Sequence, residues 1–138
     1  REDRSLVEPI IEEVLRYDPP VLLTARQTSV DTELLGHRVK EGTLVAAVLW
    51  GANRDPEVFT DPHAFDVTRA NAREHISFSS GRHHCLGASL ARLEIRVFLE
   101  ELLCRFAEIT IDPGYAPTVK PSSFVRGLSS LPVHFRAA

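Results

Sequence analysis

The chain has 138 residues and a mass of 15.4 kDa, with 43% hydrophobic and 25% charged residues. This is the balance of one soluble globular domain rather than of a disordered or fibrous chain. Its 19 acidic and 16 basic residues are spread along the length without a basic block, which argues against a nucleic-acid partner. No apolar run is long enough to span a bilayer, so we expect a cytoplasmic protein that does not bind membranes.

The cysteines and the missing methionines limit the interpretation further. Cys85 and Cys104 form no CxxC pair and cannot build a disulfide framework, which favours intracellular chemistry or core packing. The sequence starts at Arg1 and contains no methionine. We therefore expect residues 1–138 to be a fragment of a longer chain.

The first predicted elements are a helix and a small antiparallel sheet. Apolar residues recur at helical spacing from Leu6 to Tyr17, and the run Asp18-Pro19-Pro20 ends the pattern. Residues 21–30 are expected to be extended, residues 34–39 to form a short strand with a turn, and residues 43–49 to form a β-branched-rich strand. The simplest assembly of these segments is a small antiparallel sheet.

The second half of the chain predicts a long loop, a long helix and short strands. Asn, Asp and Pro are dense from Asn53 to Ser80, which predicts an ordered loop of a length that is uncommon unless it is functional. Helical periodicity returns from Leu86 to Phe106, with one apolar face made by Leu86, Leu90, Leu93, Val97, Leu102 and Phe106. Cys104 is expected in the core on this helix, and strands are expected near residues 109–111 and 128–135. The expected fold class is mainly α with small antiparallel β-sheets.

The stretch Phe78-Ser79-Ser80-Gly81-Arg82-His83-His84-Cys85-Leu86-Gly87 carries the strongest chemical signal. It delivers one cysteine to the start of the long helix, where free amide groups and the helix dipole favour a thiolate that can bind metal. Glycine at positions 81 and 87 would let the backbone approach a flat ligand. An isolated cysteine is more often a small buried hydrophobe, and a zinc site with His83 or His84 does not fit the spacing.

This stretch resembles the cysteine loop of the cytochrome P450 haem-thiolate monooxygenases, whose pattern is Phe-x-x-Gly-x-x-x-Cys-x-Gly. Phe78, Gly81, Cys85 and Gly87 occupy every fixed position, although Ser79 stands where many relatives have glycine. The family's helical Glu-x-x-Arg motif is matched by Glu13 and Arg16, and the third member of its Glu-Arg-Arg cluster by Arg69. The resemblance implies the C-terminal, haem-ligating portion of a soluble bacterial member, with the N-terminal part of the domain absent.

The resemblance also implies roles for individual residues. Cys85 would be the axial ligand of the iron of haem b and the centre of the chemistry. Arg26 and His83 match positions that bind haem propionates. The expected haem-binding set is Cys85, Arg26, His83, Phe78, Gly81 and Gly87.

Two further surfaces follow from the resemblance. An apolar small-molecule substrate would contact two segments above the haem, including Val21, Leu22, Leu23, Thr24, Phe124 and Val125. Arg82, Arg92 and Arg96 would contact an acidic, ferredoxin-like electron donor. A reductase would pass electrons from NAD(P)H to this donor. For Arg96 a solvated helix face is an equally good interpretation.

The implied function is monooxygenation, in which one atom of O2 enters an apolar substrate. The alternatives are a non-catalytic haem-binding sensor or carrier, and an inactive packing module. A sensor would need the cysteine but not the cluster of Glu13, Arg16 and Arg69, and a packing module would need neither.

Overall fold

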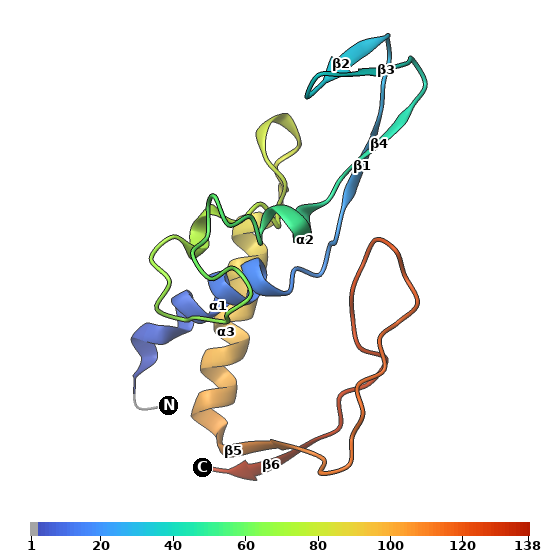
Figure 1. The fold of residues 1–138 in the computed structure, drawn as a ribbon. Coiled ribbons are helices and arrows are strands. Elements are labelled where there is room, and N and C mark those ends of the chain that lie inside the picture. The colour runs from blue at the N-terminus through green and yellow to red at the C-terminus, as the bar shows by residue number, and fades with distance from the viewer. Residues whose placement is uncertain (1–2) are drawn as a thin grey trace.

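A computed structural model describes residues 3–138. Two helices, α1 (Val7–Tyr17) and α3 (Ala88–Arg105), pack against each other at the centre, and a single helical turn, α2 (Leu49–Ala52), lies nearby (Figure 1). Three separate two-stranded antiparallel sheets accompany them. The sequence predicted α1 and α3 within two residues at each end. Much of the remaining chain is irregular, so the description "mainly α" was too strong.

Helix α1 carries the apolar core. Val7, Ile11 and Leu15 are spaced four residues apart, lie on one face and are all buried. Pro9 lies in the first turn, where its missing amide costs no helical hydrogen bond. The helix ends before Pro19, as expected, since proline disfavours helical backbone in the residue that precedes it.

The N-terminal strands form two ribbons rather than one sheet. β1 (Thr24–Gln27) pairs with β4 (Leu44–Ala47), and β2 (Thr32–Leu34) pairs with β3 (His37–Val39). The strand with a turn that was predicted over residues 34–39 corresponds to the turn at Leu35 and Gly36, which both have positive φ, followed by β3. The sequence did not predict β2, which makes this segment a hairpin. In Figure 1 this hairpin lies at the far end of the β1–β4 ribbon, away from the helices.

The first of the two C-terminal strands follows α3 directly. β5 (Phe106–Ile111) pairs with β6 (Val133–Ala137) in an antiparallel ribbon. The expected final strand thus starts later than predicted. Between the two strands the chain returns towards the N-terminal half, where an isolated bridge joins Val21 and Val125.

Residues 53–80 form the long ordered loop that the sequence predicted, interrupted by one short 3-10 helix (Ala72–Glu74). The loop packs onto α1, where Arg16 bonds its carbonyls, and Phe59 and Asn53 within it are almost fully buried. Its backbone is held by side chains of α1 rather than by strand pairing.

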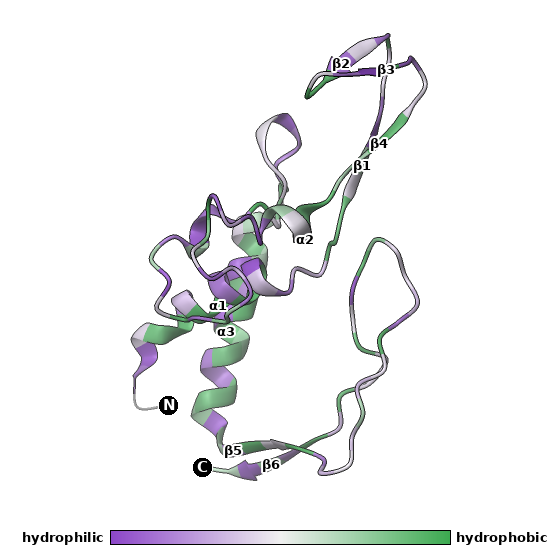
Figure 2. Ribbon diagram, viewed as in Figure 1, coloured by the Kyte–Doolittle hydropathy of each residue, from purple (hydrophilic) through white to green (hydrophobic). Residues whose placement is uncertain are grey.

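Helix α3 packs through a different face from the predicted one. Ile95, Leu99 and Leu103 lie against the α1 core. The predicted face is largely exposed: Leu86 fully, Leu90 by 58% and Val97 by 47%. Figure 2 shows apolar and polar residues alternating along the whole helix, so hydropathy alone did not single out the packed face. Cys104, expected in the core, is exposed for the same reason.

The molecular surface is large for the mass. Its accessible area is 10041 Å², whereas a compact monomer of this mass exposes about 7,200 Å². Ribbons that extend from the helices and an exposed apolar face of α3 account for this excess. Among residues 3–138, no helix combines the length and apolar character needed to cross a membrane.

Candidate functional site

The cysteine-bearing loop between residues 78 and 87 is held by its own backbone. The amide of Cys85 donates to the carbonyl of Phe78 over 2.8 Å, and the amide of Ala88 donates to the carbonyl of Cys85 over 3.2 Å. A 3-10 turn (Gly81–His83) fills the space between them. These bonds place Cys85 just ahead of Gly87, the N-cap residue of α3.

Two residues of the loop have left-handed backbone. Gly81 has φ of 63° and Ser79 has φ of 61°. Glycine adopts this conformation without steric cost, whereas serine does not. The backbone conformation therefore explains why the motif has glycine at position 81. Ser79 has a similar φ without being glycine, which leaves strain in the turn.

The Cys85 thiol is free and exposed. A Cβ atom added at Gly87 would lie 3.9 Å from its sulfur, so the glycine keeps the sulfur's surroundings open. Within residues 3–138, no three His, Cys, Asp or Glu side chains gather as a metal cage. A single free sulfur fits a cofactor that brings most of its metal's ligands with it, such as haem, better than a bare ion.

The structure brings Glu13, Arg16 and Arg69 together beneath the loop of residues 53–80. The Arg16 guanidinium forms a two-pronged pair with Glu13, with both N–O distances at 2.7 Å, and Arg69 approaches the same carboxylate at 3.4 Å. The Glu13 and Arg16 side chains are completely buried. Removing one partner of such a pair destabilises the folded protein, because the other charge is left buried without compensation.

This cluster also holds the loop backbone. Arg16 donates to the carbonyls of Asn53, Pro62 and Ala64, at 2.9 to 3.0 Å. Arg69 donates to the carbonyls of Thr60 and Asp61. Two guanidinium groups thus fix a long segment that has almost no regular secondary structure.

The pKa of Glu13 is lowered by this arrangement. Burial alone would raise it, but the hydrogen bond from Arg16, the amide of Asp66, and the charges of Arg16 and Arg69 outweigh burial. Glu13 is therefore ionised at neutral pH and serves as a fixed anion for both arginines.

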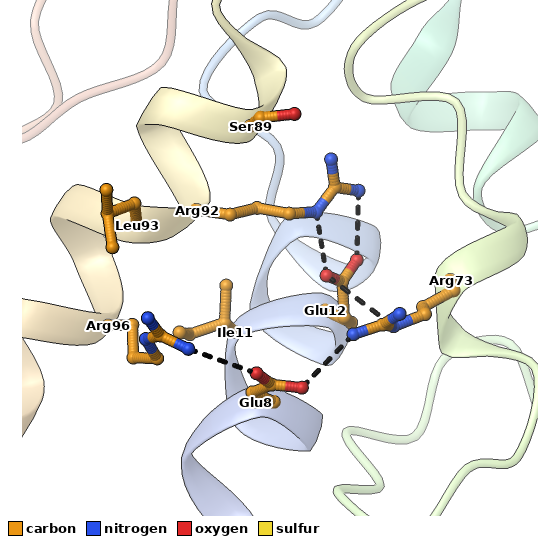
Figure 3. Close-up of a pocket in the computed structure, with 8 residues that line it drawn as sticks. All are labelled: Glu8, Ile11, Glu12, Arg73, Ser89, Arg92, Leu93 and Arg96. Carbon is orange, nitrogen blue, oxygen red and sulfur yellow. Dashed lines mark hydrogen bonds and ion pairs between the residues drawn. The ribbon is translucent and has the colours of Figure 1, made fainter.

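A second buried charge cluster was not foreseen from the sequence. The neighbouring Glu12 accepts two hydrogen bonds from Arg92, at 2.7 and 3.1 Å (Figure 3). It also contacts Nε2 of His75 at 3.1 Å. The His75 and Glu12 side chains are only 1% and 5% exposed. The only available signal was the pair of adjacent glutamates within an otherwise amphipathic helix, because His75 has no metal-like spacing.

The expected basic face for an electron donor is divided as a result. Arg92 is paired with Glu12 and only one-third exposed, and Arg96 lies 3.5 Å from Glu8. Arg82 is exposed and forms no ion pair within the described part of the chain. The three arginines therefore do not form one group of free cations, since carboxylates of α1 neutralise two of them.

The remaining candidate residues are placed as follows. Arg26 is exposed on β1 and donates to the carbonyl of Ala25, and His83 is exposed in the turn before Cys85. The two apolar segments meet: the amide of Leu22 donates to the carbonyl of Phe124 over 2.9 Å, beside the bridge of Val21 with Val125. Leu23 and Thr24 follow at the start of β1, half-buried.

The comparisons with known proteins agree with this geometry. Residues 1–135 match the family described as "Cytochrome P450". The chain is 40% identical over 135 residues to the biotin biosynthesis cytochrome P450 of Bacillus subtilis, covering 98% of this chain and 34% of that protein. It also superposes on CYP150A6 of Mycobacterium marinum, solved substrate-free, with a TM-score of 0.95 and 40% identity, covering 99% of this chain and 36% of that one.

The chain belongs to the cytochrome P450 family. It spans about a third of the length of the curated relatives it matches, which include the monooxygenase PikC of Streptomyces venezuelae at 33%. The resemblance inferred from the cysteine loop and the Glu-x-x-Arg motif is thereby confirmed at the level of the family.

Proposed function

We propose that this chain is the C-terminal, haem-ligating part of a bacterial haem-thiolate monooxygenase, in which the Cys85 sulfur would hold the haem iron. The observation that carries the proposal is the free, exposed sulfur of Cys85 on a loop whose backbone is held from both ends. A free thiol would otherwise be an unprotected, reactive group on the surface.

The haem would supply oxygen activation, and a thiolate ligand favours cleavage of the O–O bond. The overall reaction inserts one atom of O2 into a C–H or C=C bond. The second oxygen atom leaves as water, with two electrons from a donor protein and two protons from solvent. Arg26 and His83 would bind the propionates, while Phe78, Gly81 and Gly87 would shape the loop that carries the cysteine.

The substrate and the electron donor are proposed from two apolar segments and an exposed arginine. The paired segments around Val21, Leu22, Phe124 and Val125 offer an apolar wall, which suits an apolar small molecule. One solved relative is described as P450BioI in complex with an acyl carrier protein bearing hexadec-9Z-enoic acid. Arg82 is the free cation next to the cysteine, so an acidic ferredoxin-like donor with its NAD(P)H-dependent reductase remains our proposal.

The excess surface supports the assignment to one part of a larger domain. The exposed face of α3 and the extended ribbons would be covered by the rest of the P450 fold. The free thiols of Cys85 and Cys104 suit a cytoplasmic location, where cysteines stay reduced.

The test compares Cys85→Ser with Cys104→Ser in the haem-loaded full-length protein. A serine hydroxyl is a far weaker electron donor to iron than a thiolate, so Cys85→Ser should abolish both monooxygenation and the strongly red-shifted band of the reduced, CO-bound form. Cys104→Ser should preserve both. Equal losses in samples of matched haem content would contradict the assignment.

A further inference from the structure

The neighbouring glutamates of α1 hold two different parts of the structure. Glu13 faces the loop of residues 53–80, whereas Glu12 faces α3 and the segment that leads into the cysteine loop. Both carboxylates are almost fully buried. The P450 signature residues account for Glu13, but Glu12 has a separate set of partners.

Two partners of Glu12 converge on Phe78, while a third, the exposed Arg73, lies 3.9 Å from the carboxylate (Figure 3). The Arg92 guanidinium, fixed by Glu12, lies over the Phe78 ring at 4.6 Å from its centroid. The His75 ring lies 6.0 Å from the same ring, centroid to centroid. The side chain of Phe78 also packs on the α1 core, so its position is determined on several sides.

The histidine has one well-defined tautomer. Its Nδ1 accepts a hydrogen bond from the Ser77 amide over 3.1 Å, so its proton lies on Nε2 and is donated to Glu12. Burial lowers the pKa of His75, although the nearby Glu12 carboxylate acts in the opposite direction. The neutral ring therefore joins the α1 carboxylate to the backbone one residue before Phe78.

Phe78 is in turn joined to the cysteine. Its carbonyl accepts the Cys85 amide over 2.8 Å, the bond that closes the loop. A shift of Phe78 would therefore move the backbone that carries the sulfur.

We propose that Glu12, His75 and Arg92 are positioning residues that hold Phe78 and, through it, the Cys85 loop. The proposal rests on Cys85 being the haem ligand. It also assigns Arg92 primarily to this internal cluster rather than to docking of an electron donor.

The experiment uses the haem-loaded full-length protein in its reduced, CO-bound form. Glu12→Gln replaces the bidentate carboxylate by a neutral amide, and Arg92→Lys keeps the charge but loses the fork and the flat group over Phe78. His75→Leu removes the donor, and His75→Gln restores one. The matched control is Glu8→Gln, the same change one turn earlier on α1, where the carboxylate is 57% exposed (Figure 3).

The readout is the rate at which the red-shifted thiolate band is lost at a temperature where the helical circular dichroism is unchanged. We expect Glu12→Gln, Arg92→Lys and His75→Leu to lose the band about ten-fold faster, which corresponds to about 1.4 kcal/mol. Glu8→Gln should match the wild type, and His75→Gln should recover most of the loss. If Glu12→Gln takes up no haem, the rate at which Arg92→Lys loses the band, compared with that of Glu8→Gln, tests the proposal instead.

Two outcomes would overturn the proposal. In the first, Glu12→Gln, Arg92→Lys and His75→Leu lose the thiolate band no faster than the control Glu8→Gln. In the second, these variants lose the band only when they also lose the helical circular dichroism, which would indicate a general effect on stability. Cys85→Ser, measured in parallel, separates the two hypotheses. If it keeps the wild-type band, the proposed function fails, whereas if it loses the band and the cluster variants match the control, only the positioning role fails.

Discussion

Arg16 shows how much one side chain determines here. It is fully buried, pairs with Glu13 through both oxygens, and donates to three loop carbonyls. A lysine ammonium is a point charge and cannot reproduce this planar set of donors. Conservative replacement should therefore fail at this position.

We expect Arg16→Ala to destabilise the full-length protein by about 3 kcal/mol or more, since it leaves the Glu13 carboxylate buried without its partner. Arg16→Lys should recover little of this loss. Chemical denaturation and haem content measure the effect, with Arg105→Lys as control, because Arg105 forms only an exposed pair with Glu101. Normal stability of Arg16→Lys would show that the fork is dispensable.

Gly81 offers a test of backbone conformation in the cysteine loop. A Cβ at this position would meet no atom within 4 Å, so only the left-handed φ of 63° opposes a side chain. Gly81→Ala should cost about 1 kcal/mol. Gly127→Ala, equally open but without positive φ, should be nearly neutral in the same thermal unfolding measurement. A similar cost at both positions would rule out the conformational explanation.

At the level of elements, the sequence predicted α1, α3 and the long loop well. Each carries a strong local signal: apolar spacing with a following Asp-Pro-Pro in α1, and dense Asn, Asp and Pro in the loop. The turn at Leu35-Gly36 and β3 fall within the predicted strand with a turn, but β2 was missed, because its three residues are too few to show a strand periodicity.

The packed face of α3 and the second charge cluster could not be predicted, for a related physical reason. Helix α3 is apolar on more than one side, so its pattern does not say which side meets α1. His75 and Arg92 come together with Glu12 only through tertiary contacts across 63 and 80 residues. Glu13 and Arg16, by contrast, are one helical turn apart and could be found from sequence.

Helix α1 should make the protein sensitive to acid. The pKa values of Glu12 and Glu13 are lowered, despite burial, chiefly by hydrogen bonds from Arg92 and Arg16, and burial lowers that of His75. In each case the unfolded chain binds protons more readily. Stability is thus present above the unfolded pKa values and falls as pH decreases through the folded ones.

We therefore expect the unfolding free energy to decrease below about pH 6.5, first through His75 and then more steeply through the two glutamates. Denaturation curves at a series of pH values measure this. In Glu12→Gln the slope between pH 5 and 3 should be shallower, while Glu8→Gln should keep it. A pH-independent free energy over this range would contradict the linkage.

At the level of the whole molecule, the buried core is small relative to the exposed surface. Its buried apolar cluster is confined to one face of α1, while Leu90, Val97 and Phe98 on α3 are about half exposed or more. The accessible area of 10041 Å² exceeds that of a compact monomer by roughly 2,800 Å², which is the size of a large permanent interface.

Residues 1–138 expressed alone should therefore aggregate and should not hold haem stably, because one side of the cofactor would remain in water. Hemin titration and size-exclusion chromatography test this, with the same residues joined to the N-terminal part of a close relative as control. A monomeric, cooperatively unfolding chain with a stable thiolate-haem spectrum would show that it is a self-sufficient haem module.

The loop of residues 53–80 is anchored mainly through backbone carbonyls, and every residue type offers the same carbonyl. The exposed side chains of Thr60 and Ala64 take no part in the bonds to Arg16 and Arg69. Point substitutions there leave the acceptors where they were. Inserting or deleting one residue between positions 60 and 64 moves a carbonyl out of reach of a rigid guanidinium. Asp61 is an exception, because its φ of 46° restricts the residues that can replace it. Positions 60 and 64 are therefore free to vary in composition while the segment between them is fixed in length, which is the reverse of an ordinary surface loop.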